Sequence, residues 1–221
     1  MAEILFGQDD HNDHAGRMDR MYRYQRHIYD LTRKYYLLGR DRMIAELIVP
    51  EDGSLLEVGC GTGRNLLLAA RRYPGARLFG LDISAEMLAQ AGRNFRGLPL
   101  PVFRLADATS FSAGEFGTAG FDRIMISYAL SMIPDWESAI DAAIVALAPG
   151  GSLHIVDFGQ QERLPAWFRR LLIAWLSRFH VTPRATLREA LETRAKVAGA
   201  ELRFETVGRG YAWLAVVRMP G

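Results

Sequence analysis

Short buried-strand patterns alternate with amphipathic helical patterns through the middle of the chain. The strand patterns span 54–58, 77–82, 101–105, 121–126 and 151–157. Helical patterns lie between them at 64–73, 84–96 and 136–148, and turns are expected at Pro74-Gly75 and at Pro149-Gly150-Gly151. Alternation of this kind predicts a Rossmann-like α/β fold with a doubly wound, mostly parallel sheet.

The end of the chain departs from this alternation. A helix is predicted near 185–198, and two further strand patterns at 201–208 and 211–218 are joined by Gly208-Arg209-Gly210. Because so tight a link returns the chain beside itself, these two strands should form an antiparallel hairpin. The expected sheet therefore has seven strands, the last of them antiparallel.

Two segments precede the first strand. Residues 1–16 are polar and rich in His and Asp, with no apolar period, so we expect a flexible tail. His and Asp are metal-ligand types, but nothing fixes their geometry here, and we expect no metal site. Residues 17–50 have helical character and predict an N-terminal cap, with Gly39 as a candidate break between two helices. The main domain then covers 51–221.

An insertion at 160–185 follows the fifth predicted strand. Its apolar residues fall on one helical stripe with arginines at the flanks. The stripe consists of Trp167, Leu171, Leu172, Trp175, Leu176 and Phe179, and the arginines are Arg169, Arg170 and Arg178. Such a helix fits a membrane interface or the wall of a lipid tunnel. From periodicity alone, an ordinary core-facing helix with solvated arginines fits the pattern somewhat better.

The composition of the 221-residue chain narrows the classes of function. The chain is 49% hydrophobic and 24% charged, as in a globular protein, and its net charge of +2 is too small to predict nucleic-acid binding. Its single cysteine, Cys60, excludes an intrachain disulfide. We find neither a leader pattern nor an apolar run of roughly 20 residues. We therefore expect a cytoplasmic protein whose membrane contact is peripheral.

A glycine-rich loop follows the first predicted strand. It reads Glu57-Val58-Gly59-Cys60-Gly61-Thr62-Gly63-Arg64 and leads into a helix. Glycines let a backbone approach a ligand closely, and a helix N-terminus supplies N–H groups and a positive dipole, so a nucleotide-like ligand fits. In the dinucleotide pattern the third glycine would fall at position 64, but here it is Gly63. The spacing therefore disfavours a dinucleotide.

Two carboxylates follow the next strands. Asp82 closes the second strand, where it can accept from both ribose hydroxyls, and Asp107-Ala108 follows the third, where a carboxylate can accept from an adenine amino group. Taken singly, Asp82 also fits a helix-cap neighbour and Asp107 a turn residue. Ser127 and Tyr128 end the fourth strand and are assigned to the active-site floor. Cys60 fits a small packing residue better than a nucleophile.

This combination of loop and carboxylates resembles the class I S-adenosylmethionine-dependent methyltransferases, and the terminal hairpin resembles their seventh strand. The resemblance implies that Glu57 steadies the loop near the cofactor's ammonium group, that Asp82 binds ribose, and that Asp107-Ala108 faces adenine. The implied cofactor-binding set is Glu57, Gly59, Cys60, Gly61, Gly63, Arg64, Asn65, Asp82, Ile83, Met87, Asp107, Ala108 and Ser127.

The tyrosine-rich segment 24–41 resembles the N-terminal signature of bacterial betaine-lipid N-methyltransferases. It reads Tyr24-Gln-Arg-His-Ile-Tyr29-Asp30-Leu-Thr-Arg33-Lys34-Tyr35-Tyr36-Leu-Leu-Gly39-Arg40-Asp41. The resemblance implies successive methylation of the amine of diacylglyceryl-homoserine to diacylglyceryl-N,N,N-trimethylhomoserine. The implied location of the protein is cytoplasmic, at the inner face of the cytoplasmic membrane.

Acceptor residues follow from that implied chemistry. Aromatic faces can stabilise the growing positive charge, and arginines can pair with the homoserine carboxylate. We assign Tyr24, Arg33, Arg40 and Arg184 to acceptor binding, and Tyr29, Tyr128 and His180 to catalysis. His154 is interpreted as structural because it lies within a predicted strand.

Three alternatives remain open at this point. The acceptor can be phosphatidylethanolamine, since phospholipid N-methyltransferases share a shorter Tyr-Asp element in the same place. It can be a soluble small molecule, with the insertion as a lid. A non-enzymatic cofactor-binding protein is the third, although the glycine loop is intact.

Overall fold

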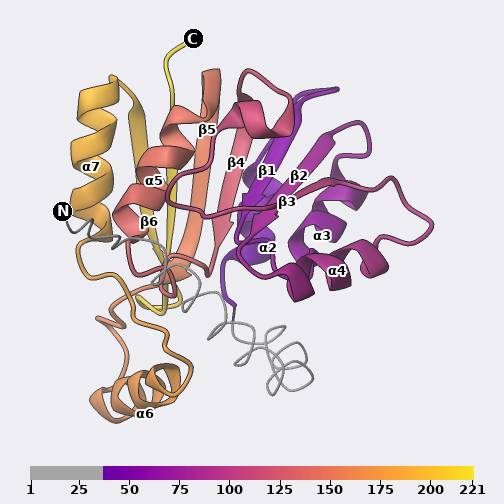
Figure 1. Cartoon of the computed structure of the whole chain (residues 1–221). Coiled ribbons are helices and arrows are strands. Elements are labelled where there is room, and N and C mark those ends of the chain that lie inside the picture. The colour runs from indigo at the N-terminus through magenta and orange to yellow at the C-terminus, as the bar shows by residue number, and fades with distance from the viewer. Residues whose placement is uncertain (1–36) are drawn as a thin grey trace, which may run out of the picture.

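The computed structural model describes residues 37–221 and shows one seven-stranded sheet with helices on both faces (Figure 1). The strands are β1 (Ser54–Val58), β2 (Arg77–Asp82), β3 (Val102–Leu105), β4 (Phe121–Ser127), β5 (Leu147–Phe158), β6 (Glu201–Val207) and β7 (Ala212–Arg218). Their order is β3-β2-β1-β4-β5-β7-β6, with β7 antiparallel to both neighbours and the other pairs parallel. The predicted fold class is confirmed.

The helices are close to those that the sequence predicts. They are α2 (Arg40–Glu46), α3 (Arg64–Arg72), α4 (Ala85–Asn94), α5 (Trp136–Val145), α6 (Ala166–Ser177) and α7 (Leu187–Ala198), with a short 3-10 helix at Ala113–Phe116. The 3-10 turn was not predicted. Among the helices of residues 37–221, none is long and apolar enough to cross a bilayer.

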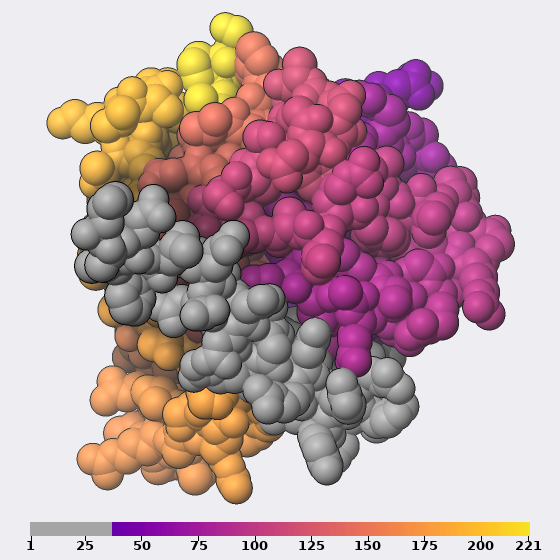
Figure 2. Space-filling view, viewed as in Figure 1, coloured from indigo at the N-terminus to yellow at the C-terminus, as the bar shows by residue number. Residues whose placement is uncertain are grey.

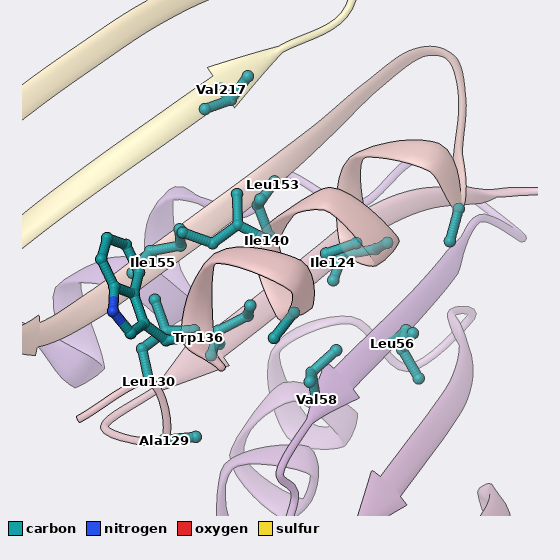
Figure 3. Packing of buried hydrophobic residues seen from close by; sticks show 14 of the residues in the cluster. Leu56, Val58, Ile124, Ala129, Leu130, Trp136, Ile140, Leu153, Ile155 and Val217 are labelled. Carbon is teal, nitrogen blue, oxygen red and sulfur yellow. The ribbon is translucent and has the colours of Figure 1, made fainter. Parts of the chain in front are cut away.

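Alternate residues along the strands serve two separate cores. Leu56, Ile124 and Ile155 pack with α5 and α7, as Figure 3 shows for Trp136 and Ile140 of α5. Leu55 and Met125, on the opposite face, pack with α2 and α3. Because both faces are covered, the central strands read as continuous apolar runs, and each fully buried side chain contributes about 2 kcal/mol.

The prediction that a turn at Pro149-Gly150-Gly151 precedes the fifth strand is wrong. β5 starts earlier, and its register with β4 shifts so that Phe121 pairs with Leu147 while Arg123 pairs with Ser152. A Cβ at Gly151 would lie 2.7 Å from the carbonyl oxygen of Ala148. The glycines therefore form a bulge inside the strand rather than a turn before it.

Gly39 marks the start of α2. Its φ of +84° is left-handed, and the backbone N–H of Met43 donates to its carbonyl oxygen at 2.8 Å. The break predicted at Gly39 therefore coincides with the beginning of a helix. The tail at 1–16 and most of the cap at 17–50 lie outside the described residues, so the proposed division of the chain stays a prediction.

The insertion after β5 carries α6 away from the sheet on two extended legs (Figure 1). On the first leg, the N–H groups of Gly159, Gln161 and Arg163 donate to the hairpin between β6 and β7. On the second, the N–H of Thr182 donates to the carbonyl oxygen of Ser131 at 2.9 Å. α6 is thus fixed at the carboxyl edge of the sheet.

Candidate functional site

A pocket opens at the carboxyl edge of the sheet, beside the loop that joins β1 to α3. The empty space in and around it is about 380 Å³, which includes space open to solvent. Its lining is Leu37, Arg40, Glu57, Gly59, Cys60, Thr62, Arg64, Asn65 and Ser127. Most of these residues belong to the predicted cofactor set, and Arg40 belongs to the predicted acceptor set. Leu37 and Thr62 were not anticipated.

The three loop glycines adopt backbone conformations that other residues disfavour. Gly59, Gly61 and Gly63 have φ values of +68°, +52° and +73°. A Cβ at Gly59 would lie 2.8 Å from the Cβ of Ala129, whereas a Cβ at Gly61 would meet no atom of residues 37–221 within 4 Å. Gly59 therefore permits packing inside the protein, while Gly61 leaves open space in which a ligand can approach the backbone.

Asp82 holds this loop from the end of β2. Its Oδ2 accepts a hydrogen bond from the N–H of Gly61 at 2.8 Å, and its Oδ1 accepts from the N–H of Ser84 at 2.9 Å. Ser84 caps α4 by accepting from the N–H of Met87 at 3.3 Å, and Ile83 lies half-buried beside it. Asp82 is thus the neighbour of a helix cap and also contacts the loop. Its role in binding ribose stays a prediction.

Two side-chain amides brace the loop. Asn65 donates from Nδ2 to Oε1 of the buried Glu57 at 2.7 Å, which fits the steadying role that the resemblance implies. Asn94, at the end of α4, donates from Nδ2 to the carbonyl oxygen of Thr62 at 3.0 Å. Sequence reasoning missed Asn94, since its partner is a backbone atom of a distant segment.

Asp107 and Ala108 lie in the turn after β3. Oδ1 of Asp107 accepts from both the N–H and the hydroxyl of Thr109, each at 2.8 Å, which is typical of a turn-forming Asp. The N–H of Ala106 donates to the carbonyl oxygen of Asp82 at 3.2 Å, so this turn adjoins the end of β2. The adenine-facing role of Asp107 and Ala108 stays a prediction.

Ser127 and Tyr128 occupy the end of β4. Ser127 lines the pocket, and its buried Oγ has no hydrogen-bond partner within the described part of the chain. Tyr128 is buried with a left-handed φ of +54°, and its hydroxyl donates to the carbonyl oxygen of Leu38. Burial, reinforced by the charge of Asp157, raises the pKa of the Tyr128 hydroxyl well above its usual value. These contacts favour a positioning role, and direct contact of Tyr128 with the acceptor stays a prediction.

Cys60 packs at the base of the loop. Its N–H donates to the carbonyl oxygen of Leu81 at 2.9 Å, and a Cβ at Gly80 would lie 2.9 Å from its Sγ. Burial, with the charges of Asp82 and Glu57, raises the pKa of the Cys60 thiol well above its usual value. The thiol therefore stays protonated, as expected for a packing residue rather than a nucleophile.

The predicted acceptor residues fall in different places. Tyr24, Tyr29 and Arg33 lie outside the described residues. Arg40 lies in the pocket with 4% of its surface exposed, and its guanidinium pairs with the exposed Asp41 at 2.8 Å. Of the predicted acceptor-binding residues in the described part of the chain, Arg40 is thus the one that lines the pocket.

Arg184 and His180 lie on the second leg of the α6 insertion. Arg184 donates from Nε to the carbonyl oxygen of Leu130 at 3.0 Å and from Nη2 to that of Ile133 at 2.7 Å. His180 is exposed and has a φ of +55°. Neither side chain lines the pocket. The contacts of Arg184 hold the loop after β4, and the acceptor roles assigned to both residues stay predictions.

A buried carboxylate at the end of β5 was missed from the sequence. Asp157 is 2% exposed and accepts from the N–H of Ser131 at 3.0 Å and from that of Phe158 at 2.7 Å. Burial raises the pKa of Asp157 to about 6 despite these hydrogen bonds and the nearby charge of Arg184. The loop after β4 is thus held by β5 on one side and by the second leg of the insertion on the other.

His154 is structural, as its position in a strand suggested. It is 2% exposed within β5, and its Nε2 lies 2.9 Å from the Ser152 hydroxyl. Burial lowers the pKa of His154 to about 3, so the ring is neutral at physiological pH. Over residues 37–221, no three His, Cys, Asp or Glu side chains gather in a way that could hold a metal ion.

The pocket and its surroundings fit S-adenosylmethionine. Asp82 offers a carboxylate for ribose hydroxyls, and the open space at Gly61 allows contact with the backbone. The buried hydroxyl of Ser127 lacks a partner among the described residues and can meet the polar methionine portion. These are properties of the site itself, independent of any relative.

Comparison with known proteins gives the same result. A methyltransferase domain family matches residues 55–151. Demethylmenaquinone methyltransferase of Thermus thermophilus is 26% identical over 215 residues, covering 87% of this chain and 96% of that protein. Trans-aconitate 2-methyltransferase of Variovorax paradoxus is 35% identical over 113 residues, covering 51% of this chain. The chain spans only 41% of the length of that second relative.

Solved structures agree at the level of the fold. The plantazolicin methyltransferase BpumL, crystallised with a triazolic desmethylPZN analog and SAH, has a TM-score of 0.69 and 15% identity. The match covers 97% of this chain and 100% of that one. The fold of this chain is thus the one seen in these methyltransferase structures, residues 55–151 match a methyltransferase domain, and S-adenosylmethionine is the cofactor that the site fits.

Proposed function

We propose that this protein methylates the amino group of diacylglyceryl-homoserine, giving the betaine lipid diacylglyceryl-N,N,N-trimethylhomoserine. One observation carries the proposal. Leu37 and Arg40, from the end of the segment that resembles betaine-lipid N-methyltransferases, line the same pocket as the cofactor loop. The described end of that segment therefore adjoins the cofactor loop, and this proximity supports the proposal.

The reaction is a displacement in which an N–C bond forms as a C–S bond breaks. S-adenosylmethionine supplies the electrophilic methyl group. The acceptor amine must be neutral, and a proton is released to water after the first and the second transfer, whereas the third leaves a fixed cation. Because water can accept these protons, the reaction requires no dedicated base. The main task of the protein is therefore to position the amine.

Arg40 is the best candidate in the pocket for binding the homoserine carboxylate. Its guanidinium is buried and pairs with Asp41, whose side chain is 78% exposed. Because Asp41 can turn towards water at little cost, an acceptor carboxylate can replace it in a bidentate contact. The fixed hydroxyl of Tyr128 holds the adjacent carbonyl oxygen of Leu38 and so keeps this segment in place.

Labelled S-adenosylmethionine, incubated with the protein and lipids from a strain that makes diacylglyceryl-homoserine, tests the proposal. We expect label in diacylglyceryl-N,N,N-trimethylhomoserine, and a KM for the acceptor that rises at least about tenfold in Arg40→Lys while cofactor affinity is unchanged. Arg42→Lys, which alters an exposed ion pair with Glu46 and Glu205, serves as the matched control. Label confined to phosphatidylethanolamine or to non-lipid products would contradict the proposal.

The second candidate is methylation of another small or amphiphilic molecule. The relatives are named for demethylmenaquinone and for trans-aconitate, so a quinone or a small acid is the competing acceptor class. A quinone would be methylated on carbon and would need no partner for a homoserine carboxylate. Label in a quinone, with Arg40→Lys as active as the unaltered protein, would favour this candidate.

A further inference from the structure

α6 presents large apolar side chains to solvent. Trp167 and Leu171, which lie four residues apart and so on one side of the helix, are 65% and 64% exposed, whereas the opposite side buries Leu172 and Leu176. Ile173, which is 46% exposed, lies between these two sides. Figure 2 shows α6 and its legs, in orange, projecting beyond the sheet-bearing body of the molecule. The inward side accounts for the packing of the helix, and the outward apolar side has no partner within the described chain.

The helix also carries exposed basic residues. Arg169, Arg170 and Arg178 are exposed, and none of the three forms an ion pair with another described residue. No Asp or Glu occurs between Arg163 and Arg188, in a chain that has 25 acidic residues. A segment that has arginines, no acidic residues, and exposed Trp and Leu is typical of helices that lie in the headgroup region of an anionic bilayer.

We propose that α6 is the membrane-docking element of this protein, with an anionic phospholipid bilayer as its partner. This inference rests on the proposed function, because docking on a bilayer would bring the protein to a lipid acceptor. Trp167 and Leu171 enter the boundary between headgroups and acyl chains, and the three arginines contact lipid phosphates. The commitment to anionic lipid rests on charge complementarity, since the surface is basic and lacks acidic residues.

The legs of the insertion connect this surface to the pocket. On the second leg, Thr182 and Arg184 bind backbone atoms of Ser131, Leu130 and Ile133, in the loop that follows Ser127 and Tyr128. α6 and the pocket both lie at the carboxyl edge of the sheet (Figure 1). A bilayer bound to α6 therefore lies on the side of the molecule from which a lipid acceptor must enter.

Co-sedimentation of the full chain with vesicles tests the proposal without turnover. The vesicles contain phosphatidylcholine with or without phosphatidylglycerol, and no amine acceptor. We expect binding to the anionic vesicles, reduced at least about tenfold in Trp167→Ser/Leu171→Ser. Arg169→Gln/Arg170→Gln/Arg178→Gln should reduce it about a hundredfold, at roughly fivefold per arginine, and should remove the preference for anionic lipid.

Val145→Ser/Val197→Ser is the matched control, because these exposed apolar residues lie on α5 and α7. Cofactor affinity should be the same in all variants, which verifies that they fold. A blue shift of tryptophan emission on anionic vesicles, lost in Trp167→Ser, gives a second readout.

Several results would overturn the inference. These are no binding to anionic vesicles, binding unaffected by the α6 variants, or equal binding to neutral vesicles. Self-association that Trp167→Ser/Leu171→Ser abolishes would assign the surface to a second copy of the chain instead. Methylation of detergent-dispersed acceptor tests the proposed function separately, so the failure of one proposal is distinguishable from failure of the other.

Discussion

The hydroxyl of Tyr128 donates a hydrogen bond to the carbonyl oxygen of Leu38 over 2.6 Å, joining the end of β4 to the segment that enters α2. Tyr128 has a left-handed backbone, and its ring packs edge-on against Phe158. A bulky residue in this conformation persists only where its surroundings hold it. The contact therefore sets the position of Leu37 and Arg40 at the pocket.

Replacing Tyr128 with Phe removes this hydrogen bond and keeps the ring. We expect the free energy of unfolding to fall by about 1 kcal/mol and the KM for the acceptor to rise severalfold. Because the pKa of the hydroxyl is raised well above its usual value, the dependence of kcat on pH between 7 and 9 should be unchanged. Steady-state kinetics and urea unfolding measure these effects.

Tyr73→Phe is a suitable control, since the Tyr73 hydroxyl donates to the carbonyl oxygen of Ile44 at 2.8 Å on the other side of α2. It should lose similar stability with no change in KM. If Tyr128 acts directly in proton transfer, Tyr128→Phe will instead lower kcat by roughly a hundredfold or more.

Alanine at two glycines of the same loop should give different defects. Gly61→Ala adds a methyl group that meets no other atom of the described chain. The protein should therefore fold, at a cost of about 1–2 kcal/mol from its left-handed backbone, while cofactor affinity falls at least about tenfold. Gly59→Ala adds a clash with Ala129 and should be the less stable variant. Calorimetric titration and thermal unfolding separate the two. Unchanged cofactor binding in Gly61→Ala would place the ligand elsewhere.

Asp82→Asn tests the carboxylate beside the loop. Loss of its charge should weaken cofactor binding by roughly tenfold or more, because neutral hydrogen bonds are weaker than charge-assisted ones. Asp122→Asn is the control, since Asp122 also accepts from backbone, at the N–H of Ser54, but at the opposite end of β1. It should reduce stability and leave cofactor affinity unchanged. Equal affinities for both variants would remove Asp82 from the site.

The sheet and the cofactor loop could be predicted because their signals are local. The apolar run at 77–82 predicted β2 with the bounds that are observed, and the spacing of the glycines predicted the loop before α3. The extension of β5 through Gly150 and Gly151 was missed because a bulge and a turn use the same residues, and only pairing with β4 distinguishes them.

The bracing of the site could not be predicted in the same way. Asn94 binds Thr62, Asp157 binds Ser131, and each partner atom belongs to the backbone, which every residue shares. No residue type in the sequence identifies such a partner. For the same reason, Arg184 was assigned to a substrate carboxylate, although its donors bind carbonyl oxygens of the loop after β4.

Arg184→Lys distinguishes these two roles of Arg184. An ammonium group cannot reproduce the planar contact with Leu130 and Ile133, so the free energy of unfolding should fall by about 1–3 kcal/mol. Cofactor affinity should stay the same. Denaturant unfolding and kinetics decide the question, because a tenfold rise in the acceptor KM at unchanged stability would restore the substrate-binding role.

Asp157 should make folding stability depend on pH in a direction opposite to that of most carboxylates. Burial raises its pKa to about 6 in the folded protein, against about 3.9 in an unfolded chain. Between these values the folded state holds the proton and the unfolded state does not, so stability falls as pH rises. Relative to Asp157→Asn, the protein should therefore lose about 2 kcal/mol between pH 4.5 and pH 7.5.

Urea unfolding of both proteins at the two pH values measures this difference. His154, whose pKa is lowered to about 3 by burial, acts in the opposite direction by destabilising the fold as pH falls. Its contribution cancels because both proteins contain it. The same pH dependence in both would mean that the carboxyl group of Asp157 is ionised in the fold at pH 4.5, contrary to its burial beside the loop after β4.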